Sequence, residues 1–511
     1  MKPNHLFSTA LLALTLAAGG CAHIPSVGPD YQPPRVSGPS QWGESLAGGE
    51  TNSNASVAGW WKNFHDAELD SLISRAAQSN LDLRIAESRV REARAEYGIA
   101  AGNLWPTIHA DGSYARQRQS PNQPLLIPSV PVPLVDNDYQ AGFDASWEID
   151  VFGGQRRSVE AAKAEVAAAE FGQHDVLITL LGEVARNYLD ARGYQRRLEI
   201  TRENIQAQEQ VLALTRNQFT NGLANNLDVQ QAATLLATTR AQVPTLETAL
   251  QMSIHRLGVL LGQPPEALQN ELAASAPIPA APPQIPVALP SELLLRRPDV
   301  AQAERQLAAA TANIGVAKAD LFPKFYLTGV AGFQGVSADD WFDAGSRFWS
   351  LGPAVQWNIF DAGRIRSNIK VQNARQQEAL ASYEKTTLTA FEDVENGLTA
   401  YAKEQVRRRS LEDAVKSSQE SLRLSKQLYA NGLSDFINVL DAERSLYQAQ
   451  DDLVQSDTTI STDLISLYKS LGGGWEIEPL PISSAEPTSC GHTNQMASNA
   501  GNQQPMAGRN P

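Results

Sequence analysis

Two long stretches without proline set the strongest limit on what this chain can fold into. One runs from Gln155 to Phe219 and the other from Gly363 to Tyr429, and both are rich in Ala, Glu, Gln, Leu and Arg. These residues favour helices, and at about 1.5 Å per residue the first stretch would extend roughly 98 Å. Local bends are allowed at Gly172, Gly182 and Gly193. A globular domain has no room for such helices, so the pattern predicts an elongated bundle or tube.

Four shorter segments alternate apolar and polar residues. From Tyr139 to Ile149 the odd positions are all apolar, and the even positions are Gln, Gly, Asp, Ser and Glu. A period of two gives a strand one apolar and one polar face, so we expect strands at about 107–116, 139–150, 324–334 and 348–360. Their lengths and their terminal aromatic residues are typical of tilted transmembrane strands. Hairpins packed on an ordinary core would alternate as well.

Transmembrane strands would require several copies of the chain. Four strands cannot close a barrel, because the smallest such barrels have about eight. An open sheet edge in lipid would leave backbone groups unpaired. We therefore expect an oligomer, with eight strands from a dimer, twelve from a trimer, or more.

The chain also contains an internal repeat. The run from Phe219 to Leu223 (Phe-Thr-Asn-Gly-Leu) is echoed by Tyr429 to Leu433 (Tyr-Ala-Asn-Gly-Leu). Leu-Trp-Pro at 104–106 is likewise echoed by Leu-Phe-Pro at 321–323. The glycine of each Asn-Gly pair can end a long helix, and Asn225 or Ser434 can cap a returning one. Each unit is therefore expected to end in a helical hairpin whose tip lies about 100 Å from the strands.

The N-terminal sequence has the pattern of an export signal. A basic start and a short apolar run precede Gly19, Gly20 and Cys21, a pattern that resembles a bacterial lipobox and predicts lipidation of Cys21. Ala18 stands where a leucine is usual, and an ordinary secretory signal is the alternative. The other cysteine, Cys490, lies in a polar tail, so no disulfide framework is expected.

Composition and motifs give little support to other functions. The net charge of -14 and a pI near 5.1 argue against a nucleic-acid partner. The seven His are scattered, and neither a phosphate-binding loop nor a nucleophile elbow is present. We therefore expect no catalytic residue, metal or cofactor.

The predicted organisation has six parts. A signal peptide (1–20) precedes a lipid-anchored segment (21–65) and a first repeat (66–262). A Pro- and Ala-rich linker (263–298) leads to a second repeat (299–474) and a largely disordered tail (475–511).

Several motifs resemble those of a known family. They are Gly-Pro-Asp-Tyr at 28–31, Trp60-Trp61, and Leu-Arg-Arg-Pro-Asp-Val at 295–300. Together with both hairpin tips they resemble the TolC-like outer-membrane efflux lipoproteins of resistance-nodulation-division pumps, the OprM type. The resemblance implies a mixed α and β membrane protein that forms homotrimers. Four strands per subunit would build a twelve-stranded outer-membrane barrel, continued by an α-helical periplasmic barrel. The resemblance also implies an equatorial region around this barrel, to which residues 21–65 and 263–298 would belong.

The resemblance also implies partners and sites. The partners would be outer-membrane lipid, a periplasmic membrane-fusion adaptor and an inner-membrane pump. The adaptor would dock at the tips, and an acidic gate would close the periplasmic mouth, although turn geometry and helix-dipole complementarity explain the same residues. A type I protein-secretion duct and an elongated periplasmic scaffold are alternatives, and the substrate stays open among antibiotics, dyes, solvents and metal ions. The tip residues are Gly222, Leu223, Gly432, Leu433 and Ser434, and the gate residues are Asp441, Asp228, Asn438 and Tyr429.

Overall fold

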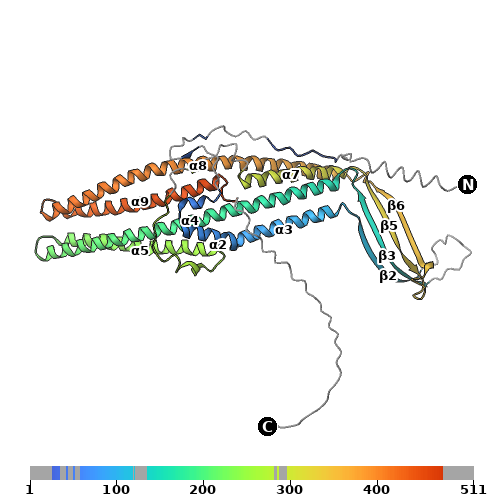
Figure 1. Cartoon of the computed structure of the whole chain (residues 1–511), viewed down its shortest axis with the longest axis horizontal. Coiled ribbons are helices and arrows are strands. Elements are labelled where there is room, and N and C mark those ends of the chain that lie inside the picture. Colours follow the sequence, from blue (N-terminus) through green and yellow to red (C-terminus); the bar gives the residue numbers. More distant parts are fainter. Residues whose placement is uncertain are drawn as a thin grey trace, which may run out of the picture. The chain divides into compact units, whose positions relative to one another are not determined.

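The computed structural model describes residues 26–34, 42–43, 50–51, 58–118, 120, 135–280, 285–286 and 296–475, which carry one helical pattern twice (Figure 1). The first copy is α3 (Leu81–Gly102), α4 (Gly154–Thr220) and α5 (Asn226–Leu260); the second is α7 (Pro298–Ala319), α8 (Arg364–Ala430) and α9 (Phe436–Ser470). The corresponding helices have 22, 67 and 35 residues in both copies, which confirms the duplication. Cys21, Cys490, the predicted leader and the tail beyond Trp475 lie outside the described residues.

Two glycines of α4, which is one continuous helix, lie where other helices pack closely against it. A Cβ at Gly193 would lie 2.5 Å from Thr458 Oγ1 of α9, and one at Gly172 would lie 2.9 Å from Gln302 of α7. The missing side chains therefore let the second repeat approach the α4 backbone closely.

The helices pack in two successive four-helix layers. In the half nearer the strands, α4 contacts α3 and α7, and α7 contacts α8. In the half that carries the tips, α4 contacts α5 and α9, and α9 contacts α8 (Figure 1). The orders are thus α3–α4–α7–α8 and α5–α4–α9–α8, so α8 is an edge of both layers and α3 and α5 form the opposite edge.

Where the layers meet, the end of a returning helix abuts the start of a short one. In the first repeat the Asn80 side chain caps α3 and donates to Leu260 O at 2.8 Å, and Ser79 Oγ donates to Leu261 O at 2.7 Å. In the second repeat Arg297, just before Pro298, donates to Ser470 O at the end of α9 at 3.2 Å. We call these two places the helix junctions.

The four long strands form one antiparallel sheet in the order β2–β3–β5–β6. They are β2 (Thr107–Arg118), β3 (Val135–Ile149), β5 (Lys324–Gly335) and β6 (Arg347–Gln356). β6 ends at Gln356, before the expected residue 360, because its partner β5 begins at Lys324, opposite Gln356. Further on, the Asp361 side chain accepts the amides of Gly363 and Ile365 at the start of α8. Trp147 and Trp357 make equivalent bonds to the carbonyls that end α3 and α7, at 2.9 and 3.1 Å.

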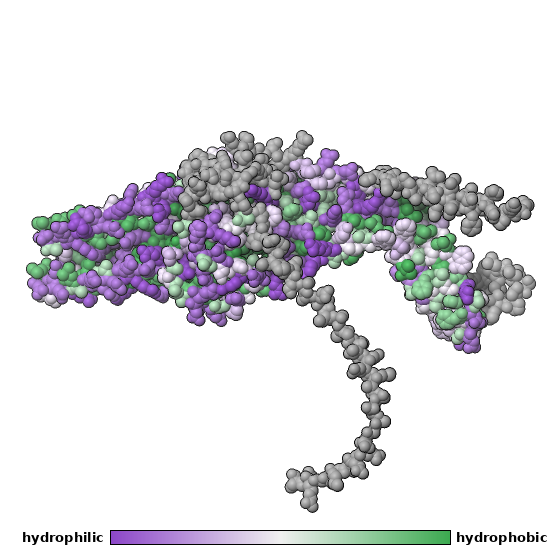
Figure 2. Space-filling model, in the orientation of Figure 1, coloured by the Kyte–Doolittle hydropathy of each residue, from purple (hydrophilic) through white to green (hydrophobic). Residues whose placement is uncertain are grey.

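The two faces of the sheet differ as the sequence predicts. One face carries large exposed apolar side chains, including Ile108, Phe143, Trp349, Leu351 and Val355, which are 62–79% exposed. Figure 2 shows apolar residues gathered over the strands and mostly hydrophilic ones over the visible face of the helices. The other face carries Thr107, His109, Asp111, Asp144 and Ser146, which the pairing registers place together. No described helix is both long and apolar enough to cross a membrane.

A buried core lies where two short helices near the N-terminus pack against the long helices. The short helices η1 (Trp60–Phe64) and α2 (Ala67–Ser79) bring Trp60 onto Tyr468, with ring centroids 5.4 Å apart. Tyr188 of α4 donates to both oxygens of Asp66, the N-cap of α2. These contacts hold η1 and α2 against α4 and α9.

Candidate channel mouth and hairpin tips

The two hairpin tips have the same backbone geometry. In the first, the amides of Gly222 and Leu223 donate to the carbonyls of Phe219 and Gln218 at 3.0 and 2.8 Å; the second makes both bonds at equivalent positions, at 3.0 and 2.9 Å. Gly222 (φ 72°) and Gly432 (φ 68°) take the left-handed conformation that ends the helix. Both glycines are thus required by the turn itself.

The leucines after these glycines need another explanation. Leu223 is 79% exposed and Leu433 is 75% exposed. The turn needs only the backbone of these residues, so their side chains are free to contact a partner. Open space surrounds the position of a Cβ on either glycine, which leaves both tips accessible.

The returning helices begin differently. Asn225 Oδ1 accepts the Asp228 amide at 2.9 Å, and Asp228 Oδ2 accepts the Asn225 amide at 3.4 Å, so Asn225 caps α5 as expected. The expectation that Ser434 caps α9 is wrong, because Asp435 takes the N-cap position without a side-chain bond. Ser434 Oγ instead accepts from Asn438 Nδ2 at 2.9 Å.

Tyr429 links the two hairpins near their tips. Its hydroxyl donates to Gln218 Oε1 of α4 at 2.7 Å, and its ring lies 5.1 Å from the Phe436 ring. Burial raises the pKa of Tyr429, and the nearby negative charge of Asp228 raises it further. Sequence reasoning missed Gln218, because nothing around a polar residue near a helix end marks it as a partner.

Asp441 and Asn438 do not join this contact. The Asp441 side chain is 60% exposed, with one oxygen 3.7 Å from Arg444 one turn along α9. The structure thus brings Tyr429 to Gln218 and near Asp228, while Asp441 stands apart on the surface of α9.

An apolar cluster beneath the tips joins both hairpins, with Tyr429 packed against its edge. Residues from α4, α5 and α9 are buried together, so the tips are held by a shared core as well as by a polar link. The cluster consists of Leu212, Val229, Ala232, Leu236, Phe436, Val439 and Leu440.

Further from the tips than this cluster, a bidentate salt bridge joins α4 to α9. Arg197 donates to both carboxylate oxygens of Asp451 at 2.7 and 3.0 Å, and the side chains are only 23% and 13% exposed. Asn204 Nδ2 donates to Gln450 Oε1 at 3.1 Å on the tip side of this bridge. A bidentate, half-buried pair holds its geometry far better than an exposed one.

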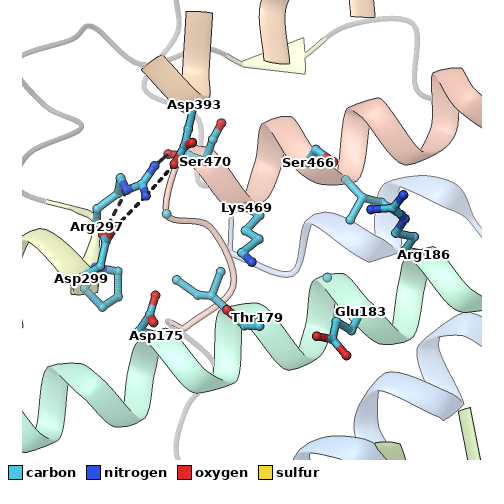
Figure 3. Close-up of a pocket in the computed structure, with 15 residues that line it drawn as sticks. Asp175, Thr179, Glu183, Arg186, Arg297, Asp299, Asp393, Ser466, Lys469 and Ser470 are labelled. Carbon is cyan, nitrogen blue, oxygen red and sulfur yellow. Dashed lines mark hydrogen bonds and ion pairs between the residues drawn. The ribbon is translucent and has the colours of Figure 1, made fainter. Parts of the chain in front are cut away.

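The second helix junction encloses a charged cavity of about 310 Å³ (Figure 3). Arg297 lies at its rim and bonds both oxygens of Asp299 at 3.0 and 2.7 Å and Asp393 of α8 at 3.0 Å. Burial lowers the pKa of Arg297, but these carboxylates outweigh it and the pKa is raised. Asp175 and Lys469 also line the cavity.

The charged side chains around the cavity join α7, α8 and α9, and they do not resemble a metal site. Burial raises the pKa of Asp175, and Asp299 adds to the rise while Lys469 and Arg297 oppose it. Acidic and basic groups are therefore mixed. In the described part of the chain, no group of three His, Cys, Asp or Glu side chains could hold a metal ion.

Comparison with known proteins matches both repeats. The family model described as outer membrane efflux protein matches residues 72–263 and, a second time, residues 289–473. The chain belongs to the outer membrane efflux protein family. The double match falls on the two helical copies, so the family is itself defined by the duplicated unit seen here.

Similarity to individual members of the outer membrane efflux protein family extends over nearly the whole chain. It is 34% identical over 485 residues to the solvent efflux pump outer membrane protein SrpC of Pseudomonas putida, covering 93% of this chain and 99% of the relative. It is 35% identical over 475 residues to the pyoverdine export outer membrane protein OpmQ of Pseudomonas aeruginosa, covering 91% and 97%. The solved outer-membrane channel OprN superposes with a TM-score of 0.82 at 34% identity, covering 88% of this chain and 99% of that one.

These similarities confirm the predicted fold class, family and cellular location. The chain is an outer-membrane efflux protein with four strands per subunit and two long helical hairpins. The gate residues, the docking tips and the lipid anchor stay predictions.

Proposed function

We propose that this chain is the exit duct of a tripartite efflux system, which works as a homotrimer and carries out no catalysis. Both helical layers and the sheet have their open edges on the same two sides: α3, α5 and β2 on one, α8 and β6 on the other. An interface between unlike edges repeats head to tail and closes into a ring. Three copies give twelve strands, enough for a membrane barrel.

Exposed apolar side chains support this closure. Leu81 and Ile85 of α3 are 54% and 51% exposed, and Leu388 and Val406 of α8 are 65% and 57% exposed. Apolar residues on two opposite edges are expected where neighbouring copies pack. The edges of β2 and β6 would pair with each other, which removes unpaired backbone groups from the lipid.

The test is the state of the purified protein. Membranes are extracted with detergent and run unheated and heated on denaturing gels, and the protein is reconstituted in planar bilayers. We expect a trimer that dissociates on heating, together with ion-conducting pores. A water-soluble monomer that forms no pores would overturn the proposal.

We further propose that the tips form a closed mouth. Threefold symmetry would bring three copies of Asp441 and of Asp228 around one axis, and such rings attract cations and repel anions. The Tyr429–Gln218 bond would help hold the mouth closed, with Asn438 lining it. We expect Asp441→Ala to lower cation selectivity in bilayers and Tyr429→Phe to raise the conductance.

Asp413→Ala is the control for Asp441→Ala, because Asp413 also lies one turn from a basic partner, Lys416, at 3.6 Å. Equal behaviour of the two Asp variants would count against the ring.

The exposed leucines are proposed to dock a periplasmic adaptor, which links the duct to an inner-membrane pump. Leu433→Asp or Leu223→Asp is expected to abolish adaptor crosslinking and efflux-dependent resistance, because a charge would replace an apolar contact. Leu424→Asp serves as the control, since Leu424 is 44% exposed but lies in α8 before the tip. Intact crosslinking in the tip variants would refute docking there.

Lipidation of Cys21 is supported by the position of Val27 and Asp30. Val27 N donates to Phe152 O at 3.0 Å, next to the end of β3. Asp30 accepts from Arg157, whose side chain is 4% exposed, at 2.6 Å. Cys21 is five residues before Ser26, a distance of at most about 18 Å, so acyl chains on Cys21 would reach lipid beside the strands. Mass spectrometry of the mature N-terminus tests this, and an unmodified Cys21 would refute it.

A further inference from the structure

One row across the mostly polar face of the sheet ends in the aromatic ring of Phe348. The pairing registers place Asp111 opposite Gly142, Gly142 opposite Gly332, and Gly332 opposite Phe348. The next row on the same face contains Asp144, with His109 directly opposite it. Trp349, the neighbour of Phe348, points to the apolar face and is 79% exposed.

Gly142 lines a hollow on this face, and Gly332 lies next to it beside the Phe348 ring. A Cβ on Gly142 would lie 2.8 Å from Ala331 O, and one on Gly332 would lie 2.4 Å from Ala141 O and 3.1 Å from Phe348 Cε1. Neither position accepts a side chain, and the Phe348 ring leans towards Gly332. The hollow measures about 260 Å³, and its lining includes Asp111, Ser113, Gln140, Asp144, Val330 and Phe348.

The walls of the hollow suit two chemistries at once. Phe348 lies on β6 and Asp144 on β3, with β5 between them and one row apart on the same face, so their backbones are about 12 Å apart. A ring offers an apolar face that attracts cations, and a carboxylate offers a full negative charge. An aromatic molecule with an ammonium group a few bonds away satisfies both.

We propose that this hollow is a weak binding site for aromatic organic cations on their way through the channel. The proposal rests on the proposed function, because the polar face borders a lumen only once the strands of several copies close into a barrel. Each trimer would then carry three such sites at one level. A purely structural role for Phe348, covering Gly332 and stabilising the β5–β6 pair, is the competing explanation.

The experiment compares two blockers of the full-length protein in planar bilayers. Benzyltrimethylammonium carries a ring and tetramethylammonium does not, and each is titrated against the potassium current. We expect benzyltrimethylammonium to reduce the current at about two- to tenfold lower concentration, the range of one aromatic–aromatic contact between its ring and Phe348. Phe348→Leu keeps an apolar cover over Gly332 but lacks the ring, so it should remove this preference while trimers and pores persist. Trp349→Leu is the matched control and should retain it.

The acidic side of the hollow is tested separately. Asp144→Asn should weaken block by both cations, and neutral benzyl alcohol should block less than benzyltrimethylammonium in the wild type. An unchanged preference in Phe348→Leu, or equal block by the alcohol, would overturn the site while leaving the duct intact. Absence of any wild-type pore would instead overturn the proposed function.

Discussion

Replacing Arg297 with alanine tests whether the second helix junction is held by one side chain. Arg297 makes four hydrogen bonds to three partners, Asp299, Asp393 and Ser470 O, and its side chain is 11% exposed. Breaking a buried ion pair costs about 3–5 kcal/mol. The Asp393 side chain is 44% exposed and can be rehydrated, so we expect the lower end, about 3 kcal/mol.

Hydrogen exchange measures this cost locally. About 3 kcal/mol corresponds to roughly a hundredfold loss of protection where the junction opens separately from global unfolding. The amide of Ala301, which donates to Arg297 O at 3.2 Å, is the natural reporter. Arg297→Lys keeps the charge but loses the planar fork, so about a tenfold loss is expected.

The control is Arg202→Ala. Arg202 pairs with Glu247 across α4 and α5 at 3.1 Å, and both side chains are at least half exposed (60% and 50%). Such pairs contribute about 0–1 kcal/mol, so protection should change less than about fivefold. If Arg297→Ala and Arg202→Ala give the same small change near Ala301, the junction is held by packing and the reasoning is wrong.

Two further predictions concern the first repeat. Burial and a hydrogen bond with Glu271 raise the pKa of Glu68 to about 7, whereas an unfolded glutamate titrates near 4.3. The folded protein therefore holds the extra proton between about pH 4.3 and 7 and loses stability as the pH rises through that window. Heat-dissociation midpoints at pH 5 and pH 8 should differ, and Glu68→Gln should shrink the difference; an equal difference would refute the assignment. Gly262 (φ 67°) would place a Cβ 2.5 Å from Ser79 O, so Gly262→Ala should destabilise by well over 1 kcal/mol. Gly222→Ala, with a similar φ but open space, should cost only about 1 kcal/mol, and thermal melts showing equal losses would contradict the clash.

Periodicity and composition predicted the elements of this fold well. The long helix expected over 155–219 is α4, Gly154–Thr220, because no proline or strong cap interrupts it. Alternation placed three strands correctly within a few residues. It extended β6 too far, because Ile359 and Phe360 continue the apolar pattern beyond Gln356, where pairing with β5 ends.

Tertiary contacts were the part that sequence could not supply. Gln218 meets Tyr429 only because the two hairpins pack side by side, and no local signal encodes that meeting. Similarly, Arg297 was noticed as part of a motif, but its partners on α8 and α9 are 96 and 173 residues away. Local sequence predicts where helices end and which side of a strand is apolar. Which side chains meet across helices depends on how the hairpins pack against each other.

The two helix junctions also have a mechanical consequence. α4 and α8 run unbroken from near the strands to the tips, whereas the other half of the wall is made of separate pieces that meet end to end at Asn80 and Arg297. Rods and jointed segments therefore alternate around each subunit. If the tips form the proposed closed mouth, bending of its helices on opening would be taken up at these junctions, and the sheet would keep its shape.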